Sequence, residues 1–396
     1  MRSRKSFTQS LSASEVNAHA KEWVQPHLKI EGTQRKCTES VILGILLIAA
    51  SRMCSLFAAC RDLAAAPSDQ ALRNALDATL PDVVELERRI NAGLATPIPK
   101  RVFRKKRDAA IDLTLIPYHG QPHEHESELY HSLAKSGTTK FHAWATLCIT
   151  ERGFRYTIAV TRVTGGEKLV DVLRRLLRQA ADRGLKIRLL QLDRGFFCTA
   201  VIAELKQTQT PFLMPVMFRG RKPKDPKKVE QSLRRFQKKP SGWYRATVSG
   251  EAGEQHIHVC VSAKYYVHEK TGKRRLKRLI FASGGWRQGQ PSDVRERYRC
   301  RFGIETSYRQ MHESRIRTTH RNPVYRLLFV GLALILRNVW VWLHYARLAD
   351  TRGENPDLRL DLLRFRQMLE WIAQVERHTL HNGALPEIVW NPNNLP

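Results

Sequence analysis

The stretch Leu185-Lys-Ile-Arg-Leu-Leu-Gln-Leu-Asp193 is the clearest structural signal in the chain. A short apolar run that ends on an aspartate, followed by the turn sequence Arg-Gly-Phe-Phe, is typical of a buried strand. The segments before and after it have the periodicity of amphipathic helices, and a second short apolar run follows them. They predict helices over 165–183 and 197–207 and a further strand over 212–216.

Three more strands are expected upstream, because short segments rich in β-branched and apolar residues occur there. They span 108–117, 141–150 and 154–163, and a tight Glu-Arg-Gly turn predicts a hairpin between the last two. The resulting order is strand-strand-strand-helix-strand-helix-strand. This is the plan of a ribonuclease-H-like α/β layer, in which helices flank a mixed sheet and the strand ends carry the chemistry.

Regions of different pattern flank this core. Residues 1–100 are expected to be helical without any strand, because Ser or Thr residues that cap helices precede several apolar periods. Residues 217–286 look like a β-rich insertion, whose entry segment 219–239 holds ten Lys/Arg and two acids. The chain becomes helical again from Ser292. The expected elements are helices over 14–23, 38–50, 55–65, 68–80, 83–94, 323–348 and 360–377, and strands over 243–248, 256–267 and 276–282.

The charge of the chain indicates a polyanionic partner. Its 396 residues include 67 Lys+Arg and 37 Asp+Glu, a formal net charge of +30 at pH 7. A folded chain with this excess repels itself unless a polyanion neutralises it, so a generic metabolic enzyme is not the default interpretation. Nucleic acid is the commonest such partner, with a membrane surface as the rival.

The cysteines and the apolar runs favour a cytoplasmic protein that does not bind a membrane. The seven cysteines are an odd number, are widely spaced and form no C-x-x-C pair, so reduced thiols are expected. No secretory signal sequence is recognisable at the N-terminus. The apolar runs 41–50 and 327–336 stop at Arg52 and Arg337, well short of the ~20 residues that a membrane span needs.

Three carboxylates occupy positions that suggest metal-dependent chemistry. Asp112 lies inside an apolar strand, Asp193 ends another strand, and Glu305 lies on the helix that begins near Ser292. A buried carboxylate is costly unless it is paired or bound to a metal, and divalent metal binding would explain all three. The alternative is that each is an ordinary salt-bridge partner or turn residue.

The helix that carries Glu305 has an unusual polar face. At 3.6 residues per turn, the residues Tyr298, Arg301, Glu305, Arg309 and His312 fall within one narrow stripe. A helix packed on a sheet would normally show Leu and Val there. The stripe therefore favours a functional face, with a solvated salt-bridge face as the alternative.

These residues together carry a family resemblance. Asp112 in its strand, Asp193 in Asp-Arg-Gly-Phe-Phe, and the Y-x2-R-x3-E spacing ending at Glu305 resemble the DDE transposases of bacterial insertion sequences. The similar branch has a Y-R-E-K signature and a β-strand insertion before the glutamate, and the resemblance covers about residues 105–345. One position departs from it, because the final Lys of the signature would fall at 312, which is His312 here.

The resemblance implies an activity and a site. Asp112, Asp193 and Glu305 would be catalytic and would hold two Mg²⁺ ions, with Mn²⁺ as a substitute, for cleavage of transposon ends and strand transfer into target DNA. Tyr298 and Arg301 would contact DNA phosphates, and Arg309 or His312 would replace the missing Lys. The partners would be double-stranded DNA and a second copy of the chain in the complex, in the bacterial cytoplasm at the nucleoid.

The sequence patterns along the chain also predict a division into regions. These would be a helical DNA-binding region (1–100), a ribonuclease-H-like core (101–216), a basic insertion (217–286), core helices with the catalytic glutamate (287–348) and a C-terminal helical region (349–396). Two other functions stay open at this stage. One is a catalytically inactive DNA-binding derivative of a transposase, and the other is a DNA nuclease with the same core.

Weaker signals leave alternatives open. The histidines at 119, 123, 125 and 131 invite a zinc site, although their spacing matches no standard ligand pair and a solvated loop is favoured. Trp286 or Trp243 would stack on a flipped base in a transposase, whereas core packing is the better interpretation for each. The basic segments 219–239 and 273–278 are expected to contact phosphates, with solvated loops as the alternative.

Overall fold

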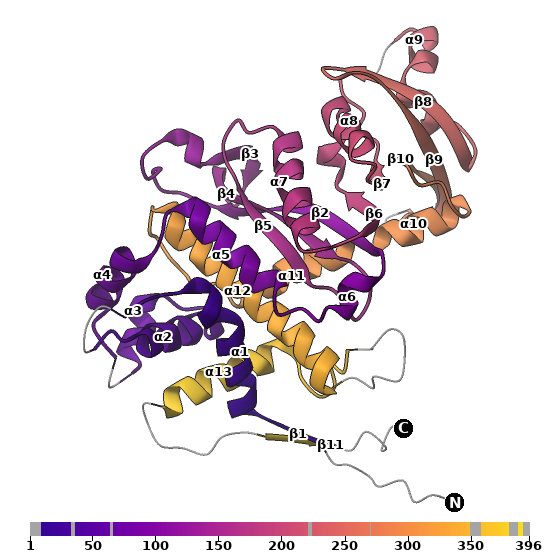
Figure 1. The fold of residues 1–396 in the computed structure, drawn as a ribbon. Helices are drawn as coiled ribbons and strands as arrows, with labels where there is room; N and C mark the ends of the chain where they lie inside the picture. The colour runs from indigo at the N-terminus through magenta and orange to yellow at the C-terminus, as the bar shows by residue number, and fades with distance from the viewer. Residues whose placement is uncertain are drawn as a thin grey trace, which may run out of the picture.

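A mixed sheet of nine strands forms the centre of the computed structural model, which describes residues 9–32, 36–63, 66–220, 224–269, 271–348, 358–379 and 387–390 (Figure 1). Its strands are β2 (Arg107–Pro117), β3 (Tyr130–Lys135), β4 (Thr138–Ile149), β5 (Thr157–Val163), β6 (Ile187–Leu192), β7 (Phe212–Pro215), β8 (Gly242–Gly250), β9 (Gly253–Val267) and β10 (Arg274–Gly284). They lie in the order β3-β4-β2-β6-β7-β10-β9-β8, and β5 also pairs with β4.

The core of the sheet has the topology that the sequence predicts. β2 is parallel to β6, β6 is parallel to β7, and β4 is antiparallel to both β2 and β5. Helices α7 (Leu169–Asp182) and α8 (Thr199–Gln207) connect β5 to β6 and β6 to β7. The predicted order of three strands, a helix, a strand, a helix and a strand is therefore confirmed, except that an additional strand, β3, lies between the first two predicted strands.

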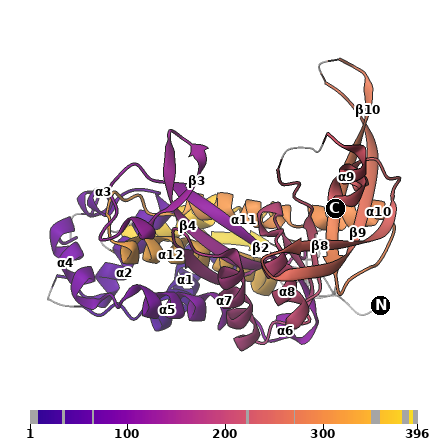
Figure 2. The same ribbon diagram turned by 90° about the horizontal axis from the view of Figure 1, so that it is seen from above.

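The β-rich segment after β7 continues this same sheet. β10 pairs antiparallel with β7 between Phe281 and Gly284, and β9 and β8 follow beyond it (Figure 2). Its entry segment, expected to be a loop, contains the short helix α9 (Pro226–Gln231) and a 3-10 turn at Leu233–Gln237. β3 was also not predicted, because its side chains are mostly exposed and give no apolar alternation.

The helices of the first hundred residues begin where the capping residues predict. They are α1 (Ala13–Leu28), α2 (Glu39–Ser51), α3 (Leu56–Arg61), α4 (Asp69–Thr79) and α5 (Val83–Ala95), followed by the single turn α6 (Arg101–Arg104). Side chains of Ser12, Thr38, Ser55, Ser68 and Asp82 accept hydrogen bonds from the first turns of α1 to α5.

The expectation that residues 1–100 contain no strand is wrong. β1 (Gln9–Ser12) pairs antiparallel with β11 (Glu387–Trp390) at the other end of the chain. Each of the two strands has four residues and pairs with the other from the opposite end of the described chain. A run this short gives no local sequence pattern from which a strand can be predicted. The predicted positions 64–65, 349–357 and 380–386 lie outside the described residues.

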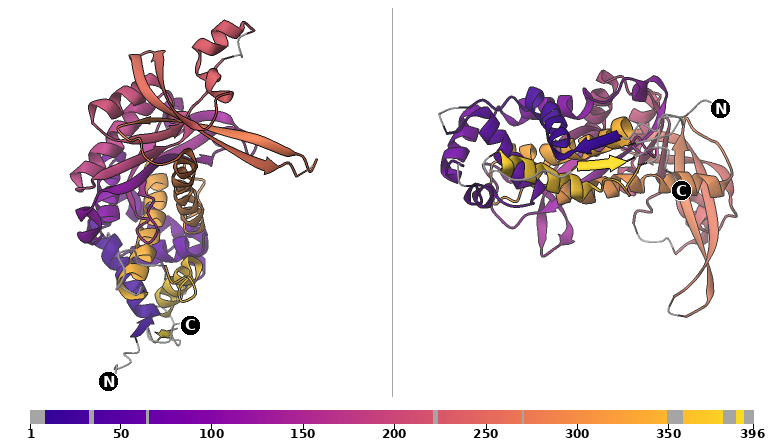
Figure 3. Two further views of the ribbon diagram at one scale, coloured as in Figure 1. Left: turned by 90° about the vertical axis from the view of Figure 1, so that its right-hand side faces the viewer. Right: turned by 90° about the horizontal axis from the view of Figure 1, so that it is seen from below.

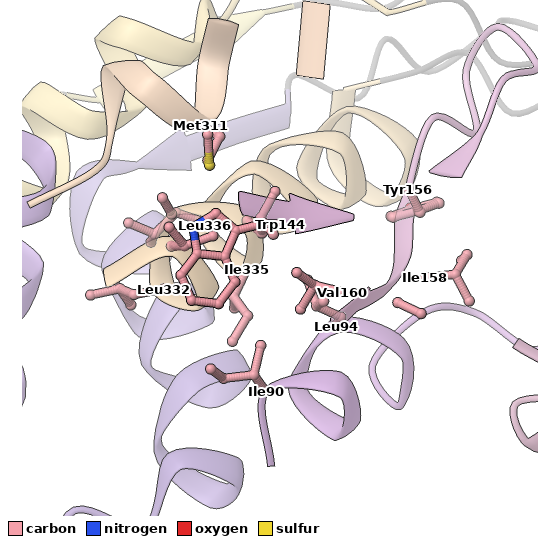
Figure 4. Close-up of a cluster of buried hydrophobic side chains, with 14 of the residues drawn as sticks. Ile90, Leu94, Trp144, Tyr156, Ile158, Val160, Met311, Leu332, Ile335 and Leu336 are labelled. Carbon is pink, nitrogen blue, oxygen red and sulfur yellow. The ribbon is translucent and has the colours of Figure 1, made fainter. Parts of the chain in front are cut away.

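Helix α12 (Pro323–Leu343), continued by a π-helical turn at His344–Leu348, is the buried axis of the molecule. It is long and apolar enough to span a membrane by length and composition alone, yet 94% of its apolar window is buried within the protein. Helix α13 (Phe365–His378) packs beside it and against α1 and α2. Figure 4 shows the core around it, where α12 meets α5, α11, β4, β5 and the residue before β5. The labelled side chains are Ile90, Leu94, Trp144, Tyr156, Ile158, Val160, Met311, Leu332, Ile335 and Leu336.

The helix expected from Ser292 onward is two helices. α10 (Pro291–Arg299) and α11 (Phe302–Glu313) are separated by a turn at Cys300 and Arg301, where i to i+3 hydrogen bonds replace the helical pattern. Gly303, a poor helix former, lies just after the break, in the first turn of α11, where an added Cβ would lie 3.0 Å from Nε of Arg155. The single continuous stripe from Tyr298 to His312 is therefore interrupted after Tyr298.

Candidate active site

Two neighbouring parallel strands bring Asp112 and Asp193 together. Ile111 of β2 lies opposite Leu192 of β6, so the residues that follow them come at the same level of the sheet. Residues opposite each other on adjacent strands point to the same face. The Asp112 side chain is 16% exposed and that of Asp193 is 47% exposed, so one acid is set inside the sheet and the other at its surface.

Helix α11 places Glu305 beside these two acids, and Tyr308 fixes the helix in position. The Tyr308 hydroxyl lies 2.6 Å from the backbone oxygen of Asp112 and 2.8 Å from Oγ1 of Thr146. Its ring is buried with Ile304 against β2 and β4. Sequence analysis did not single out Tyr308, although its spacing with Ile304 and Met311 is the i, i+4, i+7 pattern of a packed helix face.

Arg301 is the centre of the cluster. Its guanidinium donates to Oδ2 of Asp112 at 2.7 Å and to Oε1 of Glu305 at 3.0 Å, and it lies 3.7 Å from Oδ1 of Asp193. The residue is 6% exposed. One buried cation therefore joins the three carboxylates that the sequence had selected, from three different elements of the fold.

The position of Asp112 changes its acidity. Burial, and to a lesser extent the neighbouring charge of Asp193, raise the pKa of its carboxyl to about 6, although Arg301 acts in the opposite direction. When two carboxylates share one site, their mutual repulsion raises the pKa of at least one of them, as it does for Asp112 beside Asp193. The Asp112 carboxyl is therefore mostly ionised at pH 8, about half protonated near pH 6 and mostly protonated at pH 5.

Tyr298 supports the site from behind rather than lining it. Its hydroxyl donates to the backbone oxygen of Leu192 at 3.0 Å, one residue before Asp193. Its ring is 8% exposed and packs 5.0 Å from the Phe281 ring, while the Arg301 guanidinium lies 5.6 Å from its centroid. Tyr298 therefore holds the end of β6, and with it Asp193, against α10.

The other sequence-selected residues lie outside the acid cluster. Arg309 and His312 are exposed on α11, on the same helix face as Glu305. Partial desolvation, together with Arg315 and Lys135, lowers the pKa of His312, so its imidazole is neutral at pH 7. Trp286 is 7% exposed and packs between Trp243, 6.1 Å away, and the Arg297 guanidinium, 5.5 Å from its ring.

A second ionic cluster, which sequence analysis missed, fixes α10 to the sheet. Arg297 on α10 and Arg188 on β6 each lie 2.7 Å from a carboxylate oxygen of Asp108, which is 7% exposed. Glu151 accepts from Arg188 as well. These partners are far apart in sequence and have no spacing that marks them as a set.

The chemistry of the three carboxylates fits a hard divalent cation. Mg²⁺ prefers a few carboxylate oxygens together with water and substrate oxygens, and this donor set is all oxygen. Within the described part of the chain, no group of three or more His, Cys, Asp or Glu side chains converges closely enough to hold a metal ion. In the acid cluster the reason is visible, because the Arg301 guanidinium stands between the carboxylates.

Three histidines of the histidine-rich segment lie on the exposed connection between β2 and β3, and His131 lies on β3 itself. His119, His123, His125 and His131 are all exposed, and the convergence that a zinc site needs is not found among the described residues. His131 lies 3.4 Å from Glu126, an exposed pair.

Comparisons with known proteins give two findings. A family model described as a transposase DDE domain matches residues 103–339, which includes all three acids. Among solved structures, the chain is similar to the piggyBac transposase in its synaptic complex with hairpin DNA, with a TM-score of 0.53 and 12% identity. That match covers 92% of this chain and 78% of the other, and it shows a ribonuclease-H-like transposase fold. No curated protein matches the chain.

Proposed function

Because the chain belongs to the family of transposase DDE domains, we propose that it cuts DNA at the ends of a mobile element and joins those ends to a target. The observation that carries the proposal is the meeting of Asp112, Asp193 and Glu305 around one guanidinium, within the region that the family model covers. DDE transposases are generally metal-dependent phosphoryl-transfer enzymes.

The three carboxylates are the proposed ligands of two Mg²⁺ ions, with Mn²⁺ as a substitute. When bound, such ions activate the attacking oxygen and stabilise the leaving oxygen of a phosphodiester. The chain contributes the positions of the ligands: β2 and β6 set the two aspartates at one level, and Tyr308 sets α11 against β2. Precise placement of this kind supplies a large part of the catalytic effect in phosphoryl transfer.

Arg301 can pair either with the carboxylates of the site or with a phosphate of bound DNA. Its guanidinium is attracted to the carboxylates while they are ionised and bind no metal. A bound divalent cation would compete with Arg301 for the same carboxylate oxygens. A guanidinium released from them is a planar fork that suits a DNA phosphate. We therefore assign Arg301 to a phosphate near the cut, with Arg309 and His312 contacting the strand farther along α11.

The finer identity is a bacterial insertion-sequence transposase of the branch with the Y-R-E-K signature. Tyr298, Arg301 and Glu305 support this assignment, and His312 departs from it. We propose a homodimer on DNA in the bacterial cytoplasm, with residues 1–100 reading the element's ends and the C-terminal helices taking part in assembly. For Trp286, whose ring is buried under Arg297, packing is the favoured role over stacking on a base.

The proposal is tested with a supercoiled plasmid that carries the inverted repeats flanking the coding region. The wild-type protein should nick the plasmid in Mg²⁺ but not in EDTA, and should transfer the cut ends to a second DNA. Asp193→Asn, at an exposed side chain, should abolish nicking and leave DNA binding nearly intact. Asp182→Asn, at an exposed residue at the end of α7, is the matched control and should nick normally.

The outcomes separate the alternatives. Nicking by Asp193→Asn at the wild-type rate would contradict the metal assignment. Binding without any nicking by the wild-type protein would identify an inactive DNA-binding derivative. Cutting without transfer of the ends would identify a nuclease.

A further inference from the structure

The ends of β9 and β10 form a two-stranded arm that leaves the body of the protein. β8 pairs with β9 only up to Val261, and β7 pairs with β10 only from Phe281, so the residues between have no strand partner except each other. We call residues 263–278 the β9–β10 arm. Figure 3 shows it projecting away from the helices and from the rest of the sheet.

The two faces of the arm differ in chemistry. Cross-strand partners share a face, so the register pairs Lys264 with Lys277 and Tyr266 with Arg275 on one side, the basic face. The opposite side pairs Tyr265 with Leu276, Val267 with Arg274 and Ala263 with Arg278. We call it the apolar face for its exposed Tyr, Val and Leu side chains, although it also carries these two arginines. Tyr265 is 54% and Val267 64% exposed, which is unusual for side chains of this type.

Among the residues that the structure describes, the cations of the basic face have no acidic partner. The arm holds seven Lys/Arg and one Glu. None of Lys264, Arg275 and Lys277 takes part in an ion pair with any of the residues that the structure describes. On the apolar face, by contrast, the Arg274 guanidinium lies 4.4 Å from the centre of the Tyr265 ring.

The distribution of charge along the chain points to the same region. Residues 217–286, which include the arm, hold 18 Lys/Arg against 5 Asp/Glu. Residues 1–100, the helical region, hold 13 against 10. The positive excess that a polyanion would neutralise is therefore larger in the segment beyond β7, which comprises the basic entry segment 219–239 and strands β8 to β10, than in the N-terminal helices.

We propose that the β9–β10 arm is a DNA-binding ribbon that lies in the major groove of a duplex with its basic face toward the DNA. A two-stranded ribbon fits this groove, which is about 12 Å wide, and flanking Lys and Arg side chains reach the phosphates on its walls. The proposal deepens the proposed function, on which it rests for the identity of the polyanion. Duplex DNA is preferred to a membrane because Lys264, Arg275 and Lys277 lie on the face opposite the exposed side chains of Tyr265, Val267 and Leu276.

Two adjacent arginines provide a matched test, because Arg275 lies on the basic face and Arg274 on the apolar face. Binding of the full-length protein to a 30-base-pair duplex is measured in EDTA over a range of salt. Arg275→Gln should weaken binding roughly 3- to 10-fold and reduce the salt slope by about one, whereas Arg274→Gln should change binding less than twofold. The double variant Lys264→Gln/Lys277→Gln should reduce the slope by about two.

The results distinguish failure of this inference from failure of the proposed function. If the wild-type protein binds and the two arginine variants lose affinity equally, or neither loses any, the arm does not dock through its basic face. The inference would also be overturned if Arg275→Gln weakened binding to anionic phospholipid vesicles more than it weakened binding to the duplex. A wild-type protein that binds no duplex at all would contradict the proposed function itself.

Discussion

The acid cluster and the β9–β10 arm use arginine in opposite ways. Arg301 is buried, and its charge is balanced by three carboxylates of the same chain. The arginine and lysines of the basic face stand in solvent without an acidic partner among the described residues. A net charge of +30 describes both regions equally and distinguishes neither.

The difference teaches which cations are available to DNA. A cation held by the protein's own acids contributes to the fold until something displaces it, while a solvated cation contributes to binding from the start. Substitutions at Arg301 should therefore change stability and metal binding. Substitutions on the arm should change DNA affinity alone.

The largest expected effect on stability is that of Arg301→Gln. Removing the shared counter-ion leaves three neighbouring carboxylates to repel one another, so the free energy of unfolding in EDTA should fall by about 2–3 kcal/mol. Mg²⁺ should recover part of this loss and bind the variant more tightly than the wild type. Arg309→Gln, at an exposed arginine of the same helix, is the control and should change stability by less than about 0.5 kcal/mol. The measurement is urea unfolding with and without Mg²⁺. Equal losses of unfolding free energy in Arg301→Gln and Arg309→Gln would show that Arg301 does not stabilise the fold as a shared counter-ion.

Tyr308→Phe should have the next largest effect. The hydroxyl bonds the backbone of Asp112 and the side chain of Thr146 in a buried place, so its removal should cost about 1–2 kcal/mol. Because the helix would be held less firmly against β2, the cleavage rate should fall while DNA affinity stays the same. The measurement combines urea unfolding with single-turnover cleavage. An unchanged cleavage rate would show that this contact serves the fold only.

The acidity of Asp112 predicts a pH dependence that the arm does not share. With its pKa raised to about 6, protons compete with Mg²⁺ at this carboxylate, so Mg²⁺ affinity should fall up to tenfold per pH unit below 6. The same shift favours the protonated form in the folded state, so this group's contribution to stability is present at low pH. It is lost as pH rises through about 4 to 6. Calorimetric Mg²⁺ titrations at several pH values test this, with Asp112→Asn expected to remove the dependence.

The smallest effect is expected from the arm. Lys264→Gln/Lys277→Gln should leave the free energy of unfolding within about 0.5 kcal/mol of the wild type, because exposed cations without partners contribute little to the fold. Thermal unfolding of the double variant beside Arg301→Gln gives the comparison directly. A loss as large as that of Arg301→Gln would mean that the arm is part of the folded core.

Much of the fold was predictable, because its strands and helices are short-range patterns. The runs ending at Asp193 and around Asp112 are buried strands, and the capped helices of residues 1–100 begin where Ser and Thr predict. The pairing of β1 with β11 was not predictable, since four-residue strands at opposite ends of the chain share no local signal. The turn at Cys300 and Arg301 was missed because helical spacing continues on both sides of it.

The candidate site was predictable in its residues but less so in their roles. Helical spacing placed Arg301 on the polar face, and the family resemblance implied that it contacts DNA. The structure shows it joined to the three acids, a contact that depends on two strands distant in sequence. Tyr298 was selected for the site face, yet its hydroxyl bonds the end of β6. The ion pairs of Asp108 with Arg188 and Arg297 were not predicted, because residues that pair across a large sequence separation have no characteristic spacing.

The most direct test of the central claim is single-turnover cleavage of element-end DNA, with each protein saturated with that DNA before Mg²⁺ is added. Asp112→Asn, Asp193→Asn and Glu305→Gln should each lower the cleavage rate by at least about 10³-fold while duplex affinity in EDTA changes less than twofold. Asp182→Asn should cleave like the wild type. Wild-type rates in any one of the three acid variants would contradict the assignment of that carboxylate to the reacting site.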